Sequence, residues 1–121
     1  MKRILLCSQE PLLIKELYGP IRDGGIEVVT IEYISDAVRE FLANRYDAVI
    51  LDTRNIGLNA YEAASIMKDT ISSAPIFLLT DSVSEKTRLK DGVYVTGSPK
   101  EIDSFLAMFK EIIRNRSSVL I

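Results

Sequence analysis

The chain has 121 residues, of which 47% are hydrophobic and 26% charged, and its net charge at pH 7 is −2. These values describe one soluble globular domain, and the negative balance offers no basic surface for direct nucleic-acid binding. The absence of His excludes imidazole as a general base or zinc ligand. The single Cys7 excludes an internal disulfide and fits a reducing compartment. No apolar run is long enough for a signal peptide or a membrane span, so a cytoplasmic location is predicted.

Five short apolar runs have the length and β-branched content of strands that are buried on both faces. These runs are residues 4–7, 28–31, 48–51, 76–79 and 93–95. Between them lie segments with helical spacing of apolar residues. The first carries Leu12, Leu13 and Leu17 on one face, and we expect it to end or kink at Gly19-Pro20.

The second helix is predicted to begin at the N-cap pair Ser35-Asp36. Its apolar face consists of Ala37, Val38, Phe41 and Leu42. The third helix is predicted over residues 60–68, and its inward side consists of Ala63, Ala64 and Met67.

The last helix has the clearest apolar stripe, which consists of Ile102, Phe105, Leu106, Phe109, Ile112 and Ile113. Residues Ser98 to Glu101 form a predicted capping box with Pro99 at the first helical position. Residues 117–121 show no pattern. We therefore predict one domain over residues 1–116, followed by a C-terminal tail or the start of a linker over 117–121.

The alternation of strand and helix predicts an α/β fold with a parallel sheet, right-handed crossovers and helices on both faces. In such folds, reactive groups gather outside the carboxyl ends of the strands. The residues predicted to leave those ends are Ser8-Gln9-Glu10, Asp52, Thr80-Asp81 and Gly97-Ser98. They form the candidate site.

The stretch LDTRNIGLNAYEA, residues 51–63, resembles the phosphoacceptor segment of response-regulator receiver domains, and the resemblance extends over residues 2–115. It implies a flavodoxin-like (βα)5 doubly wound fold, with a five-stranded parallel sheet in the order 2-1-3-4-5. It also implies that Asp52 is the phosphoacceptor, Gly57 the loop glycine and Thr80 the switch residue. Pro99 matches the proline that follows the fifth strand.

The sequence departs from this family in its charged residues. Family members hold a divalent cation, usually Mg²⁺, with an acidic pair after the first strand and with the acceptor Asp. A Lys before the fifth-strand proline holds a phosphoryl oxygen. Here the acidic pair is replaced by the neutral Ser8 and Gln9, followed by Glu10, and the Lys by Ser98. We therefore expect no confident metal site, and weak binding at most through Glu10 and Asp52.

Two further departures concern the loops. The segment between Thr80 and Pro99 is shorter than is typical of the family, so the fourth helix is predicted to be shortened across residues 81–92. Arg54 stands two positions after the acceptor. Its guanidinium can fold back onto Asp52 as a charge-assisted pair and partly replace the missing metal.

Simpler interpretations of the same residues stay open. Asp52 can serve only to accept hydrogen bonds from its own loop, and Thr80 to bond the local backbone. The capping box accounts for Ser98, and a carboxylate at Glu10 is favourable at a helix N-terminus without any ligand.

The sequence predicts an atypical pseudo-receiver that works in phosphorelay signalling or transcription control through protein–protein interaction. It is not an enzyme, beyond self-phosphorylation on Asp52 at most. The predicted partner is a histidine kinase, an output domain or a second copy of the chain. One alternative is a receiver that still accepts a phosphoryl group on Asp52. Another is a flavodoxin-like binder of a small ligand, although no Gly-rich loop follows the first strand.

Overall fold

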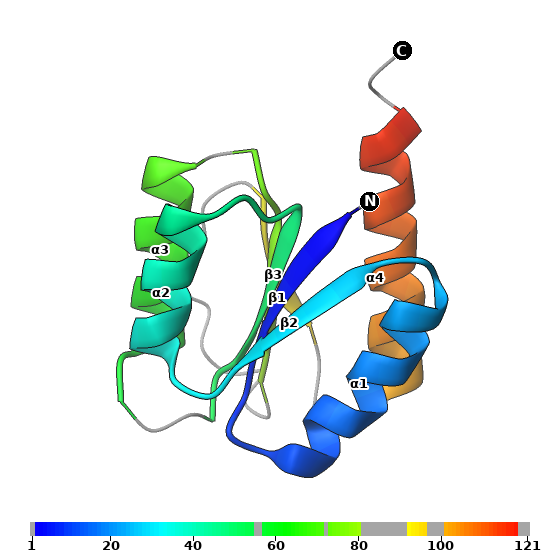
Figure 1. Cartoon of the computed structure of the whole chain (residues 1–121), viewed down its shortest axis with the longest axis horizontal. Helices are drawn as coiled ribbons and strands as arrows, with labels where there is room; N and C mark the ends of the chain where they lie inside the picture. Colours follow the sequence, from blue (N-terminus) through cyan, green and yellow to red (C-terminus); the bar gives the residue numbers. More distant parts are fainter. Residues whose placement is uncertain (1, 55–56, 72, 81–91, 97–100, 119–121) are drawn as a thin grey trace.

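The computed structural model describes residues 2–54, 57–71, 73–80, 92–96 and 101–118. These residues form a parallel sheet of five strands with helices on both faces (Figure 1). The strands are β1 (Arg3–Cys7), β2 (Glu27–Ile31), β3 (Ala48–Asp52), β4 (Ile76–Leu79) and β5 (Val93–Thr96). The helices are α1 (Pro11–Asp23), α2 (Ile34–Ala43), α3 (Ala60–Thr70) and α4 (Ile102–Ser118). The strand order β2-β1-β3-β4-β5 confirms the predicted doubly wound α/β class and the order 2-1-3-4-5.

The three central strands are apolar except for Arg3 at the start of β1 and Asp52 at the end of β3, because helices cover both faces of the sheet. All residues of β3 and β4 are buried, as are the last four of β1. The register places Cys7 of β1 opposite Leu51 of β3, and Asp52 opposite Leu79 of β4. The carboxyl ends of these three strands therefore meet at one edge, which is the lower end of the sheet in Figure 1.

Helices α2 and α3 cover one face of the sheet, and α1 and α4 cover the other (Figure 1). Side chains alternate between the two halves of the core, with Leu5 and Leu51 on the α2–α3 side and Ile4 and Ile50 on the α1–α4 side. The α1–α4 side holds an aromatic cluster, which consists of Phe77, Tyr94, Phe105 and Phe109. Burial of one such ring contributes about 1.5–3 kcal/mol, so this cluster fixes α4 to the sheet.

The first helix does not end at Gly19-Pro20. It continues to Asp23, and Pro20 lies inside it. A proline within a helix costs about 3 kcal/mol because it removes one hydrogen bond and crowds the preceding turn. Leu17 and Ile21 lie on either side of Pro20 and are both buried. Their packing against the sheet offsets the local cost, which the sequence pattern alone does not reveal.

The predicted start of the second helix is wrong. Helix α2 begins at Ile34 with Tyr33 as its N-cap, and no side chain caps it. Ile34 is 1% exposed, whereas Leu42, which we expected in the core, is 44% exposed. The buried face is therefore Ile34, Ala37 and Phe41, because burial of Ile34 favours an earlier start than the polar N-cap pair suggested.

The other helices follow the prediction more closely. In α3, Ala63, Ala64 and Met67 are buried as expected, and the Asn59 side chain caps the helix by accepting from the backbone N–H groups of Tyr61 and Glu62. In α4, the buried part of the stripe consists of Phe105, Leu106, Phe109 and Ile113. Ile102 and Ile112 are partly buried.

Some predictions fall outside the described residues. These are Ser98 and Pro99 of the capping box, and the shortened helix across residues 81–92, of which only Gly92 is described. Helix α4 itself runs through Ser118, so the division at residue 116 stays a prediction. Over the described part of the chain, no helix combines the length and apolar character needed to cross a membrane.

Candidate functional site

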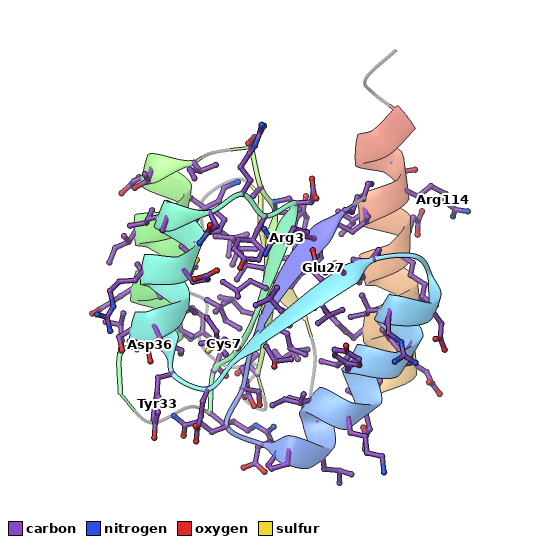
Figure 2. The ribbon with its side chains drawn as sticks, viewed as in Figure 1. Arg3, Cys7, Glu27, Tyr33, Asp36 and Arg114 are labelled. Carbon is purple, nitrogen blue, oxygen red and sulfur yellow. The ribbon has the colours of Figure 1, made fainter. Side chains whose placement is uncertain are left out.

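Asp52 is the last residue of β3, and it is 0% exposed. Ser8, the residue after β1, is 1% exposed and contacts it, while Thr80, the residue after β4, is 4% exposed. Cys7, labelled in Figure 2, marks the carboxyl end of β1 from which Ser8 leaves. The structure thus brings the candidate residues Ser8 and Asp52 together, and places Thr80 at the end of the neighbouring strand.

Four hydrogen bonds converge on the Asp52 carboxylate. Its Oδ1 accepts from the backbone N–H of Arg54 at 3.0 Å and from Arg54 Nε at 3.0 Å. Its Oδ2 accepts from Arg54 Nη2 at 2.9 Å and from Ser8 Oγ at 2.9 Å. An ionised carboxylate has about four lone-pair positions, so these donors fill them. The predicted fold-back of Arg54 onto Asp52 is present as a two-pronged, charge-assisted pair.

The loop after β3 turns so that the Arg54 side chain contacts Asp52. Thr53 extends the pairing with β4, because both its backbone N–H and its Oγ1 donate to the Leu79 carbonyl at 2.9 Å. The chain then turns, and the Asp52 side chain accepts from the backbone two residues on, which is the geometry of an Asx turn. Gly57 follows with φ 115°, a backbone conformation that side chains other than hydrogen rarely allow.

Ser8 connects the acid to the start of α1. Its hydroxyl donates to Asp52 Oδ2 and accepts from the backbone N–H of Glu10 at 3.0 Å. From the sequence, Ser8 was expected only to lack the charge of the acid that it replaces. In the structure its hydroxyl is instead a neutral donor to the carboxylate and brings no negative charge to a cation.

The arrangement does not fit Mg²⁺ while the pair is closed. Mg²⁺ requires six oxygen ligands, of which the protein usually supplies one or two carboxylates and water supplies most of the rest. Gln9 is half-buried, and Glu10 is exposed and makes no side-chain capping bond. Among the described residues, no group of three His, Cys, Asp or Glu side chains is placed to hold a metal ion. Ser98 lies outside the described residues, so its part in the site stays a prediction.

An open pocket of about 490 Å³ lies beside this site, against the carboxyl ends of β1 and β2. It is lined by Ser8, Gln9, Pro11, Ile14, Thr30, Ile31 and Glu32. These described lining residues include one carboxylate and no cation, so they do not suit a phosphate-bearing ligand of the flavodoxin type.

Sequence reasoning did not find Thr53, which anchors the loop. The sequence feature that could have indicated it is a threonine directly after a strand. A β-branched residue at that place can continue the pairing between strands, and its hydroxyl can bond the backbone.

Solved structures similar to this chain include response regulators. No family model matches the sequence. The response regulator TrrA from Thermotoga maritima, solved in complex with Mg²⁺ and BeF, is 29% identical; the match covers 92% of this chain and 98% of TrrA, with a TM-score of 0.77. TrrA bound to histidine kinase ThkA matches with 27% identity over 92% of this chain and 97% of TrrA, with a TM-score of 0.70.

The chain is therefore similar, over nearly its whole length, to response-regulator receiver domains. A curated relative, the uncharacterised transcriptional regulatory protein YvcP of Bacillus subtilis (strain 168), is 28% identical over 119 residues. The match covers 94% of this chain and 49% of YvcP, so the chain spans about half the length of this relative.

Proposed function

We propose that this receiver domain signals by protein–protein interaction with Asp52 closed in an internal ion pair, and not by routine transfer of a phosphoryl group to Asp52. The observation that carries the proposal is the Arg54 guanidinium, which donates to both oxygens of a fully buried carboxylate. In this state Arg54 supplies the positive charge that a divalent cation supplies in other receivers.

The closed pair opposes phosphorylation in two ways. A carboxylate attacks phosphorus through an oxygen lone pair, and the lone pairs of Asp52 are engaged by Arg54 and Ser8. In addition, the incoming anion needs positive charge beside it, but the Arg54 guanidinium is already paired with the nucleophile. Moving the guanidinium away leaves the buried Asp52 carboxylate without a compensating charge. This costs several kcal/mol unless water or another cation replaces the guanidinium.

The alternative is a receiver that still accepts a phosphoryl group on Asp52. One observation favours it: the Arg54 side chain is 34% exposed, so its guanidinium has a path into solvent. In that mechanism Arg54 swings from the carboxylate to the incoming phosphoryl oxygens, and Thr80 contacts the phosphorylated product. The histidine kinase would then be the partner, as ThkA is for TrrA.

The proposed partner is a histidine kinase, an output domain or a second copy of the chain, and YvcP, of which the match covers 49%, has room for an output domain beside its matched segment. Mg²⁺ binds weakly at most, because Ser8 and Gln9 bring no charge to the site.

Amide NMR with Mg²⁺ and beryllofluoride tests the proposal. In the wild type we expect no saturable shifts at Asp52, Thr53 and Thr80 at millimolar Mg²⁺. Saturable shifts there that disappear in Asp52→Asn would overturn the closed-pair function and establish the phosphoacceptor.

The variant Arg54→Ala then probes the role of the guanidinium. We expect it to bind Mg²⁺ at least about tenfold more tightly than the wild type, because the Asp52 lone pairs become available. The matched control is Arg39→Ala, which removes an exposed arginine paired with Asp36 on α2 and must leave Mg²⁺ affinity unchanged. Equal Mg²⁺ affinity in Arg54→Ala and the wild type would show that Arg54 does not stand in place of the metal.

A further inference from the structure

A second pocket, of about 360 Å³, lies at the opposite end of the sheet from Asp52. It is formed where the end of α1, the start of β2 and the second half of α4 meet. Its lining residues are Lys2, Ile21, Gly24, Gly25, Ile26, Phe109, Lys110, Ile113 and Arg114. None of the residues used by the Asp52 site takes part in it.

The floor of this pocket is apolar. Ile21, Phe109 and Ile113 are 1%, 0% and 6% exposed, and Ile26 is partly buried against the same cluster. The turn after α1 contributes Gly24 and Gly25, which add backbone but no side chain over the opening. A hydrocarbon or aromatic group seated here would be removed from water, which is favourable by about 25 cal/mol for each Å² of apolar surface.

The rim of the pocket is positively charged. Lys110 and Arg114 are both exposed and lie four residues apart on α4, so they occupy the same face of the helix. Neither is in an ion pair among the described residues, and Arg114 projects outward from α4 in Figure 2. Lys2 adds a third positive charge and ties the N-terminus to α4 by donating from Nζ to the Ile113 carbonyl at 2.9 Å.

This concentration of charge does not follow from the composition, because the whole chain is acidic with a net charge of −2. Like charges four residues apart on a helix destabilise it by about 0.2–0.5 kcal/mol. The helix dipole favours cations near the end of α4, but it does not require an apolar pocket beneath them. No acidic residue is among the described residues that line the pocket.

We propose that this pocket binds a small amphipathic anion, that is, a carboxylate attached to a short hydrocarbon or aromatic body. The body lies against Ile26 and the edge of Ile113, above the fully buried Ile21 and Phe109, and the carboxylate lies between Lys110 and Arg114. Because the pocket joins α1 to α4, a bound ligand ties α4 more firmly to the domain. The site gives the receiver a chemical input that is independent of Asp52.

Titrations followed by amide NMR test this proposal, with octanoate as the probe. Octanoate is expected to bind with a Kd of about 1 mM or tighter. It is expected to shift the amide signals of Gly24, Gly25 and Ile26 and to leave those of Asp52 and Thr80 unchanged. Acetate, which has the charge without the body, and octylammonium, which has the body with the opposite charge, are expected to bind at least about tenfold more weakly.

Charge reversal on α4 supplies the matched variants. Lys110→Glu/Arg114→Glu is expected to weaken octanoate binding at least about tenfold, and the exposure of both residues keeps the fold intact. Lys15→Glu changes an exposed lysine on α1 that does not line the pocket, and it must bind octanoate as the wild type does. Absence of saturable shifts, equal binding of octylammonium, or full binding by the double variant would overturn the proposal.

Discussion

The two ends of the sheet each hold an arginine–carboxylate pair, and the two pairs are built differently. At the carboxyl end, Arg54 grips Asp52 with two side-chain donors, and the Asp52 side chain is 1% exposed. At the amino end, Arg3 Nε lies 2.8 Å from Glu27 Oε2, but the side chains are 38% and 50% exposed. Arg3 Nε also has no partner that meets hydrogen-bond geometry. The contact has the distance of an ion pair without the alignment of a hydrogen bond.

The amino end depends instead on several separate contacts. The Arg3 guanidinium lies 4.9 Å from the centre of the Tyr46 ring, and the Arg3 backbone N–H donates to Asp47 Oδ2 at 2.8 Å. Figure 2 shows Arg3 and Glu27 close together at this end of the sheet. Since both pairs join an arginine to a carboxylate, burial and alignment, and not residue type, distinguish what each contributes to stability. At the carboxyl end one buried ion pair makes the main polar contribution to stability, whereas at the amino end several weaker contacts share it.

Breaking the buried pair is expected to give the largest effect. Arg54→Ala leaves Asp52 buried with only Ser8 and one backbone N–H as donors, and we expect the free energy of unfolding to fall by about 2–4 kcal/mol. Urea unfolding at pH 7 measures it. Arg39→Ala, which breaks an exposed pair, is expected to cost less than about 0.5 kcal/mol. A similar loss in the two variants would show that the Asp52 pair is no stronger than a surface pair.

Gly92→Ala is expected to have the next largest effect, at the amino end of β5. Gly92 has φ 88°, and a Cβ there would lie 2.5 Å from Nζ of Lys68, whose ammonium donates to the Ala74 carbonyl at 3.0 Å. We expect a loss of about 1–2 kcal/mol in urea unfolding.

The background variant Lys68→Ala separates the two causes of that loss. With the ammonium removed, Gly92→Ala retains only the backbone strain, so its cost is expected to fall to about 1 kcal/mol. An unchanged cost in this background would assign the whole effect to the backbone conformation.

The sequence predicted the sheet well because its signals are local and redundant. Strands β1, β3 and β4 are continuous apolar runs between polar residues, and few other structures bury such runs on both faces. The helix ends were harder to predict. Pro20 and the start of α2 depend on what Ile21 and Ile34 pack against, and a linear pattern does not contain that information.

At the candidate site, the sequence indicated the positions of Asp52 and Arg54 but not the hydrogen bonds around them. The spacing placed Asp52 at a strand end and Arg54 within reach of it. The hydroxyl of Ser8 donating to that acid required the register of β1 against β3. Buried Lys68 gave no sequence signal, because a lysine on an amphipathic helix is normally exposed.

Tyr46 provides a pH-dependent test of the amino end. Burial, and then its hydrogen bond to the Glu40 carboxylate at 2.6 Å, raise the pKa of Tyr46 from 10.0 to about 12. A raised pKa favours the protonated form in the folded state, so this contribution is complete below pH 10 and is lost as the pH rises through about 12. We expect a loss on the order of 1 kcal/mol over that range, measured by urea unfolding.

Two variants identify the cause of this pH dependence. Tyr46→Phe is expected to remove it, and Glu40→Gln to reduce it, because the amide keeps an acceptor for the phenol but removes the negative charge. A slope between pH 10 and 12 that is the same in Tyr46→Phe as in the wild type would assign the pH dependence to other groups.

The smallest effect is expected from Glu27→Gln, which removes the charge of the exposed pair and keeps the shape of the side chain. Because Arg3 retains the Tyr46 ring and its backbone bond to Asp47, the loss is expected to stay below about 0.5 kcal/mol and to disappear in about 1 M salt. Arg3→Ala removes the ring contact as well and is expected to cost about 0.5–1 kcal/mol more. If Glu27→Gln instead costs as much as Arg54→Ala, alignment and burial do not distinguish the two ends of the sheet.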